Sequence, residues 1–238
     1  MTQQLLGTLW GVGVGPGDPE LITVKAARLL AQSPVVAFPA GRGGHPGIAQ
    51  KIIADHLRPE QIQLPLYFPY VQAVADLEAA WVTAAETVWQ PLMQGQDVVF
   101  ATEGDASFYS TFTYLSQTLQ RLHPKARVET VAGVCSPLAA AAVLGSPLTI
   151  LQQRLMVLPA LYAIADLEAA IDQADVVVLM KVASVYAEVW PILERRHLLD
   201  QSAVVVRASQ ETERVYSTLT DHPTLELPYF SVLIIHCR

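Results

Sequence analysis

The chain has 238 residues, of which 52% are hydrophobic and 16% are charged. This composition excludes a disordered chain, and the length fits two domains of usual size. The formal net charge of −7 gives no overall attraction to nucleic acid or to an anionic membrane, so an anionic substrate would need a local basic patch.

The cysteines, the histidines and the apolar stretches further limit the classes of protein that fit this sequence. Cys135 and Cys237 lie far apart without a C-x-x-C spacing, and the six histidines show no metal-ligand spacing, so we expect neither a disulfide framework nor a metal site. No basic N-terminal region precedes an apolar run, and no apolar stretch approaches the roughly 18 residues of a membrane helix. We therefore expect a cytoplasmic protein that binds neither membrane nor nucleic acid.

The sequence predicts alternating strands and helices in the first half of the chain. The pattern predicts strands over 8–14, 35–38 and 97–102 and helices over 22–30, 77–88 and 108–122. The loop over 41–47 follows the second strand, and Pro91 and Gly95 are expected to stop the long helix. His123-Pro124 breaks the last helix, so we predict domains over 1–123 and 124–238.

The second half also predicts an α/β domain. Expected there are strands over 128–131, 175–180, 203–207 and 229–236 and an alanine-rich helix over 137–144. Because residues 146–158 show no clear crossover helix, we expect consecutive strands here to pair antiparallel.

The turn GVGVGPGDP after the first strand is the most distinctive motif. Its glycines allow positive φ and a close approach by a ligand. Proline at position 16 breaks the dinucleotide fingerprint, and no Gly-Lys-Ser/Thr phosphate loop occurs. The turn thus predicts a small-molecule site that is neither a dinucleotide site nor a P-loop, with Asp18 capping the helix that follows.

Similar turn chemistry follows other predicted strands, in Glu103-Gly104-Asp105, in AGVCSP and after Met180 and Arg207. Ligands of α/β sheets collect at the carboxyl ends of strands, so these loops favour one shared crevice, although each alone reads equally well as a capped tight turn. Cys135 is read as a turn residue rather than a nucleophile, because no histidine is placed to activate it. Cations near the loop ends that can receive a polycarboxylate, or are simply exposed charges, are Arg42, His45, Lys181, Arg207 and Arg214.

Three segments in order, GVGVGPGDPELITVKAARLL, TEGDASFYSTFTYL and VAGVCSPLAAAAVLGSPL, resemble the signature regions of the S-adenosylmethionine-dependent tetrapyrrole (corrin and porphyrin) methyltransferases. The resemblance covers nearly the whole chain. VVAFPAG, FYST and PYFSVLII are most similar to the branch that methylates carbon 20 of precorrin-2 or of cobalt-factor II in cobalamin biosynthesis.

The resemblance implies two α/β domains with a ligand cleft between them, S-adenosylmethionine as methyl donor, a tetrapyrrole substrate and a homodimer. Carried over by position, the cofactor-binding residues are Pro16, Glu103, Gly104, Asp105, Phe108, Cys135, Ser136, Met180 and Ala208. We expect Asp105 and Tyr109 to be catalytic residues beside the substrate, and Arg42 and Arg207 to meet its carboxylates. No metal is implied.

Departures from the family pattern keep alternatives open. Ala106 and Ala132 stand where the family usually has proline, Cys135 replaces a hydroxyl residue, and Pro39 replaces an aspartate of the uroporphyrinogen methyltransferases. The alternatives are methylation of a different corrin carbon, a non-catalytic protein that binds S-adenosylmethionine or a tetrapyrrole, and an enzyme acting on RNA or on a protein histidine. The acidic balance argues against RNA.

Overall fold

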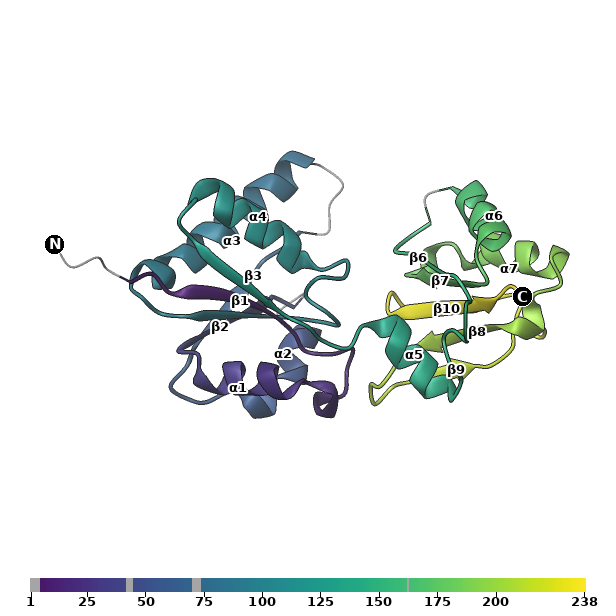
Figure 1. Cartoon of the computed structure of the whole chain (residues 1–238), viewed down its shortest axis with the longest axis horizontal. Helices are drawn as coiled ribbons and strands as arrows, with labels where there is room; N and C mark the ends of the chain where they lie inside the picture. The colour runs from purple at the N-terminus through teal and green to yellow at the C-terminus, as the bar shows by residue number, and fades with distance from the viewer. Residues whose placement is uncertain (1–4, 42–44, 70–73, 162) are drawn as a thin grey trace. The chain divides into compact units, whose positions relative to one another are not determined.

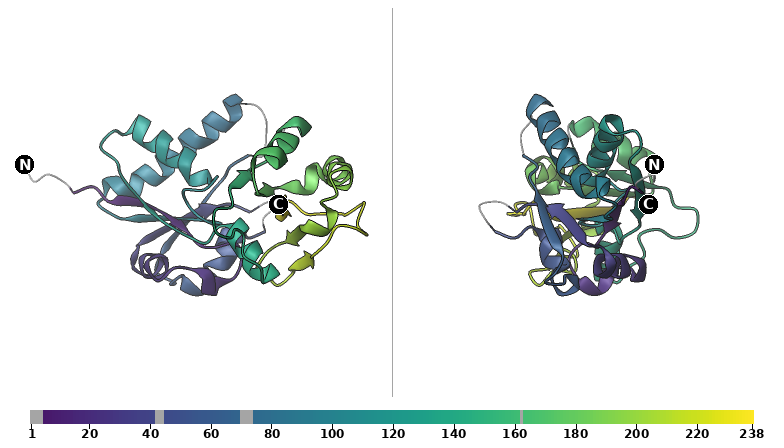
Figure 2. Two further views of the ribbon diagram at one scale, coloured as in Figure 1. Left: turned by 45° about the vertical axis from the view of Figure 1, so that its right-hand side comes forward. Right: turned by 90° about the vertical axis from the view of Figure 1, so that its left-hand side faces the viewer.

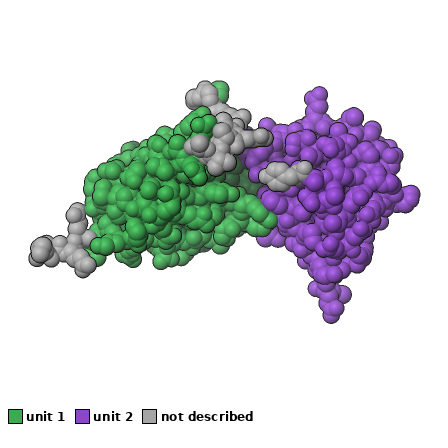
Figure 3. Space-filling view, turned by 90° about the horizontal axis from the view of Figure 1, so that it is seen from above, with its two compact units in different colours: residues 1–135 green, residues 136–238 purple. Residues whose placement is uncertain are grey.

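The computed structural model describes residues 5–41, 45–69, 74–161 and 163–238. The chain divides into two compact units, Met1–Cys135 and Ser136–Arg238 (Figure 3). This division falls after the boundary predicted at 123/124, because β5 (Arg127–Val131) pairs in parallel with β1 (Thr8–Gly13) and so belongs to the first sheet.

The first unit contains a five-stranded sheet in the order β3-β2-β4-β1-β5, with every neighbouring pair parallel. Its other strands are β2 (Val35–Pro39), β3 (Ile62–Leu66) and β4 (Val98–Thr102). The central strands β2 and β4 are buried apolar runs except at their last residues, the partly exposed Pro39 and the polar Thr102, as expected of a parallel sheet covered on both faces. Their carboxyl ends therefore all lie at one edge of the sheet.

Helices cover both faces of this sheet. The helices are α1 (Val24–Gln32), α2 (Ile48–Ile52), α3 (Val74–Met93) and α4 (Thr111–Leu122). α1 and α2 lie on one face of the sheet, and α3 and α4 lie on the other (Figure 1). Figure 2 shows the same arrangement from two further directions. Side chains alternate accordingly: Val36 and Val99 pack with the first pair of helices, and Val98 and Phe100 with the second.

Several local expectations for this unit change. Asp18 caps the short 3-10 turn Pro19–Leu21, while α1 begins later with Thr23 as its cap. Pro91 lies inside α3 near its end rather than stopping it. α4 begins at Thr111, because the residues after Asp105 form a turn and Ser110 supplies the cap.

The second unit has a mixed sheet in the order β6-β7-β10-β8-β9. Its strands are β6 (Leu155–Leu158), β7 (Val176–Met180), β8 (Ser202–Val206), β9 (Arg214–Tyr216) and β10 (Ser231–His236). β6 and β7, which α6 (Ile164–Gln173) connects, are parallel, and the other neighbouring pairs are antiparallel. The expected antiparallel pairing of consecutive strands therefore holds for β8 and β9 but not for β6 and β7, and β7 and β8 pair with β10 rather than with each other.

Helices again cover both faces of the second sheet. α6 and α7 (Tyr186–Arg195) pack on the face that carries Val177 and Leu233, and α5 (Ser136–Leu144) contacts β8 and β10 on the opposite face. Along the described helices, none combines the length and apolar character that crossing a bilayer requires.

Candidate functional site

The order of the first sheet creates a topological switch point between β1 and β4. These strands are neighbours, yet the chain leaves β1 toward α1 on one face and leaves β4 toward α4 on the other. Ligands of open α/β sheets bind in the crevice that such a divergence opens at the carboxyl edge. The glycine turn and the Glu103-Gly104-Asp105 turn are the two loops that border this point.

Glycine backbone joins the loops at this edge. Gly104 donates its N–H to the carbonyl of Gly15 at 2.8 Å, and Gly15 donates to the carbonyl of Gly104 at 3.1 Å. Both have positive φ, 80° at Gly15 and 69° at Gly104. Glycine is needed at Gly133 for a different reason, since a Cβ there would lie 2.3 Å from the carbonyl oxygen of Gly104.

Asp105 ties the β4 loop to the β5 loop. Its Oδ2 accepts the backbone N–H of Gly133 at 2.7 Å, and its Oδ1 accepts the N–H and hydroxyl of Ser107 at 2.8 and 2.5 Å. Partial burial by itself would raise the pKa of Asp105, but these hydrogen bonds together outweigh it and hold the pKa below its usual value. Asp105 is therefore a charged clamp that positions two loops.

Glu103 is the contrasting carboxyl of the same turn. Removal from water raises its pKa to about 7, and a hydrogen bond from the backbone N–H of Ala49 in α2 only partly opposes that rise. A carboxyl with this pKa exchanges a proton near neutral pH. The sequence suggested a cofactor contact at Glu103 but contained no signal for its burial.

Phe108 and Tyr109 follow on the outer side of the β4 loop. Tyr109 has a φ of 51° and an exposed ring, and the two rings meet edge to face at 4.6 Å between centroids. Left-handed backbone at an aromatic residue costs free energy and concentrates at functional loops. Ser110 accepts the N–H of Phe112 and shares a hydrogen bond with Thr102, which holds this segment against β4.

The other predicted residues of this edge lie beside the same loops. Pro16 is buried directly after Gly15. Cys135 is a half-buried free cysteine that ends the first unit, and its Cα lies 3.8 Å from where a Cβ on Gly104 would stand. Ser136 begins α5 in the second unit. Arg42, a predicted substrate residue, lies outside the described residues.

In the second unit, Met180 and Arg207 end up at the same edge of the sheet. Met180 pairs with Val232 and Val206 pairs with Ser231, so the ends of β7 and β8 flank the start of β10. Ala208, a predicted cofactor-binding residue, follows Arg207 and is buried, with 5% of its surface exposed.

Three non-glycine residues near these strand ends have left-handed backbone. The φ angles are 55° at Lys181, 50° at Arg207 and 62° at Ser209. Arg207 donates its N–H to the carbonyl of Phe230 at 2.7 Å, and the Lys181 ammonium lies 5.3 Å from the centroid of the Tyr229 ring. The loops after β7 and β8 are therefore held tightly around the start of β10.

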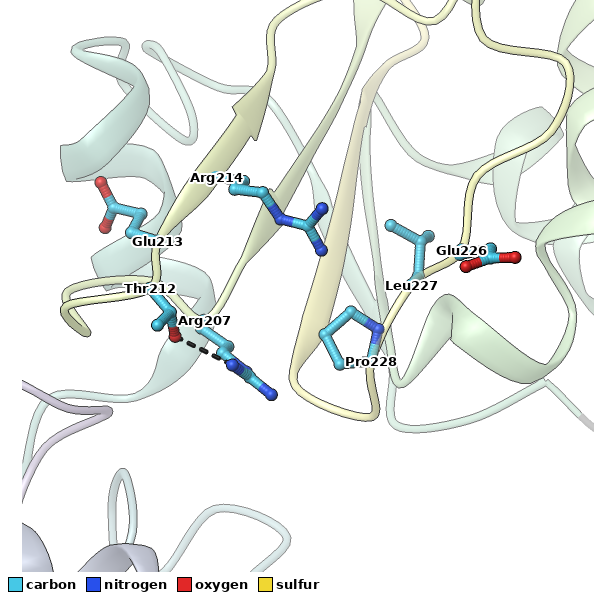
Figure 4. A pocket seen from close by; sticks show the side chains of 7 residues that line it. All are labelled: Arg207, Thr212, Glu213, Arg214, Glu226, Leu227 and Pro228. Carbon is cyan, nitrogen blue, oxygen red and sulfur yellow. Dashed lines mark hydrogen bonds between the residues drawn. The ribbon is translucent and has the colours of Figure 1, made fainter.

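Arg207 also lines a pocket of about 530 Å³ within the second unit. The lining residues are Arg207, Thr212, Glu213, Arg214, Glu226, Leu227 and Pro228 (Figure 4). Arg207 donates to the hydroxyl of Thr212 at 2.9 Å, and the Arg214 guanidinium is directed toward Leu227 and Pro228 (Figure 4). Glu213 accepts the N–H of Ser209 at 2.5 Å.

The lining carries two guanidinium groups, which can pair with carboxylates, and two carboxylates of its own, Glu213 and Glu226, so its formal charges balance. Within the described ranges, Arg214 forms no ion pair, and no group of histidine, cysteine, aspartate and glutamate side chains is arranged to hold a metal ion. Sequence reasoning placed Arg214 only among several loop cations. Its position on β9, a short edge strand, became visible only in the tertiary structure.

Known proteins resemble the chain along nearly its full length. A cobalt-precorrin-2 C(20)-methyltransferase of Salmonella typhimurium is 34% identical, with 97% of this chain and 96% of that protein covered. A precorrin-2 C(20)-methyltransferase of Sinorhizobium is 32% identical, with 97% and 95% covered. The cobalamin biosynthesis protein CobIJ of Mycobacterium tuberculosis is 36% identical, but the chain spans only 46% of its length.

Solved structures share the fold. A cobalt precorrin-4 methyltransferase superposes with a TM-score of 0.74 at 23% identity, over 96% of this chain and 94% of that one. The uroporphyrin-III C-methyltransferase of Thermus thermophilus, complexed with S-adenosyl homocysteine, gives 0.68 at 23% identity, over 96% and 97%. The family model of the tetrapyrrole (corrin/porphyrin) methylases matches residues 8–223. The resemblance in the sequence motifs is thereby confirmed, and the chain belongs to the tetrapyrrole methylase family.

Proposed function

We propose that the chain transfers a methyl group from S-adenosylmethionine to carbon 20 of precorrin-2 or of its cobalt-containing counterpart, in cobalamin biosynthesis. The observation that carries this proposal is the end-to-end match to two relatives of nearly equal length, both named for methylation at carbon 20. The motifs VVAFPAG and PYFSVLII, in strands of the two separate units, support the same assignment.

The switch-point turn fits a methyl donor of this kind. S-adenosylmethionine supplies an activated methyl group on a sulfonium, so the protein need not generate a strong nucleophile. A Cβ on Gly104 would meet the Cα of Cys135 at 3.8 Å, an ordinary van der Waals contact, so it is the positive φ of 69° rather than close packing that favours glycine in this turn. Residues proposed to hold the donor are Pro16, Gly104, Asp105, Phe108, Cys135, Ser136, Met180 and Ala208, together with the backbone of Glu103.

The other side chains of the proposed site hold its loops or the substrate in place. Asp105 keeps the β4 and β5 loops together, and the exposed ring of Tyr109 beside them is proposed to line the macrocycle. Arg207 and Arg214 are proposed to receive carboxylates of the substrate, because guanidinium groups pair with carboxylates in bidentate geometry. Holding the substrate carbon in line with the donor methyl and excluding water supplies most of the rate enhancement.

A second candidate is methylation of carbon 11. A precorrin-4 C(11)-methyltransferase of Pseudomonas aeruginosa is 32% identical over 143 residues, which covers 60% of this chain and 50% of that protein. The shorter match makes carbon 20 the better supported position.

The deciding experiment incubates the protein with S-adenosylmethionine carrying a ¹³C-labelled methyl group and, in parallel, precorrin-2 or its cobalt-containing counterpart. NMR of the product identifies the methylated carbon. Label at carbon 20 is expected, and label at another carbon would move the chain to another branch of the family. Absence of both turnover and S-adenosylhomocysteine binding would contradict the enzymatic assignment. We also propose a homodimer, to be checked by light scattering at assay concentration.

A further inference from the structure

Two carboxylates occupy one turn at the switch point, and their surroundings differ. Both oxygens of Asp105 accept hydrogen bonds, from Ser107 and Gly133, within the turn and across to the neighbouring loop. Glu103 accepts from the backbone N–H of Ala49, and no other hydrogen bond to its carboxyl is formed within the described ranges. Glu103 therefore retains lone pairs that the fold does not use.

The position of Glu103 favours a role in chemistry. It is the first residue after β4, the strand at the centre of the sheet, and it precedes the glycine whose backbone pairs with Gly15. Its side chain reaches toward α2, on the face to which the chain also turns after β1. The carboxyl thus lies at the divergence of the two ligand-bordering loops.

We propose that the Glu103 carboxylate is the proton acceptor of the methyl-transfer reaction. This inference rests on the proposed function. Carbon 20 uses a ring π pair to bond the methyl carbon, and the pair of the broken S–CH₃ bond stays on sulfur. The hydrogen of carbon 20 then leaves as a proton, its C–H pair returns to the ring, and a Glu103 oxygen takes up the proton.

The proton affinity of Glu103 suits this step better than that of Asp105. A general base works best with a pKa near the working pH, and burial places Glu103 there while hydrogen bonds keep the pKa of Asp105 low. No charged side chain of the described part is among the causes of the Glu103 shift. Titratable or charged groups on the surrounding elements are Asp105 in the same turn, Asp18 after β1, and His45 and Lys51 around α2.

Glu103→Gln is the informative variant. The Gln amide oxygen can still accept from Ala49, so the loop geometry is kept and only the proton-accepting charge is lost. We expect kcat to fall by roughly 10²–10⁴-fold, while the Kd for S-adenosylhomocysteine stays within about twofold. In the wild-type protein kcat/KM should rise with pH through an apparent pKa near 7, and in Glu103→Gln this rise should disappear. Glu60→Gln removes a glutamate whose side chain is 64% exposed and should match wild type.

The outcomes separate the possible failures. The inference would be overturned if Glu103→Gln had the same kcat and the same pH profile as the wild-type protein. It would also be overturned if Glu103→Gln lost turnover and S-adenosylhomocysteine binding together, because that result indicates that the side chain holds the cofactor. If Glu103→Gln does not fold, Glu103→Asp replaces it as the test variant, because it keeps a carboxylate. Its kcat should be reduced, and its kcat/KM should still change with pH. If Glu103→Asp retains turnover but its kcat/KM no longer depends on pH, the inference is also overturned. A wild-type protein inactive on both tetrapyrroles refutes the proposed function itself.

Discussion

Glu103 makes the stability of the first unit depend on pH in a direction that can be calculated. Folding raises its pKa from 4.5 to about 7, so between these values the folded protein binds a proton that the unfolded chain has released. Its contribution to stability is complete below pH 4.5 and is lost as the pH rises through 7. One pKa unit corresponds to about 1.4 kcal/mol, so ionised Glu103 costs at most about 3 kcal/mol at pH 8.

Replacement by glutamine removes this cost. Glu103→Gln is neutral at every pH and keeps an oxygen for the N–H of Ala49. We therefore expect the free energy of unfolding to exceed the wild-type value by up to about 3 kcal/mol at pH 8, and to equal it within about 0.5 kcal/mol near pH 4.5. The negative charge of Glu103 destabilises the fold, and the proposed reaction requires the same charge. Such a trade-off between stability and activity is common at active sites.

Urea unfolding followed by tryptophan fluorescence provides the measurement. Trp10, Trp81 and Trp89 lie in the first unit and only Trp190 in the second, so the signal reports mainly the unit that contains Glu103. Glu60→Gln, on an exposed ion pair with Arg58, should change the midpoint little at either pH. A Glu103→Gln protein no more stable than wild type at pH 8, with an equal m-value, would refute the argument. A stabilisation of equal size at both pH values would do so too.

Three further changes test the packing and charges of the site. Gly133→Ala should destabilise the first unit by more than about 2 kcal/mol in urea titrations, since its Cβ would meet the backbone of Gly104 at 2.3 Å and of Gly13 at 2.8 Å; a neutral effect would show that these loops are loosely held. Arg214→Ala should raise the KM for the tetrapyrrole about tenfold without changing the Kd for S-adenosylhomocysteine in calorimetry, and an unchanged KM would remove Arg214 from the substrate site. Asp105→Asn should lower the unfolding midpoint at pH 7 and lose this effect as the pH falls below about 4, because a carboxylate with a depressed pKa stabilises only while ionised; a pH-independent loss would indicate packing rather than charge.

Local sequence pattern was sufficient for the central framework of both units. The apolar runs that become β2, β4 and β7 are bounded by turn residues and are long enough to be recognised without tertiary information. The turn around Pro16 is equally local, since proline and glycine restrict or extend backbone freedom by themselves. The order of three such motifs along the chain identified the family.

Tertiary structure decided what depends on partners distant in the chain. The edge strands β3, β6 and β9 are short and partly exposed, so their own residues carry little pattern, and pairing with a buried neighbour makes them strands. The placement of β5 in the first sheet depends on its register with β1, more than a hundred residues earlier. The loss of helix propensity around residue 123 indicated a break in the chain. It did not indicate which sheet the next strand joins.

The site shows the same division. The sequence by itself determined that a glycine turn and the Glu103-Gly104-Asp105 turn follow two strands. Only the fold placed those strands side by side with their loops diverging, withdrew Glu103 partly from water and brought Gly133 to Asp105. A residue type specifies which protons and hydrogen bonds are available, but proton affinity depends on the water that distant elements exclude, and no local pattern encodes that exclusion.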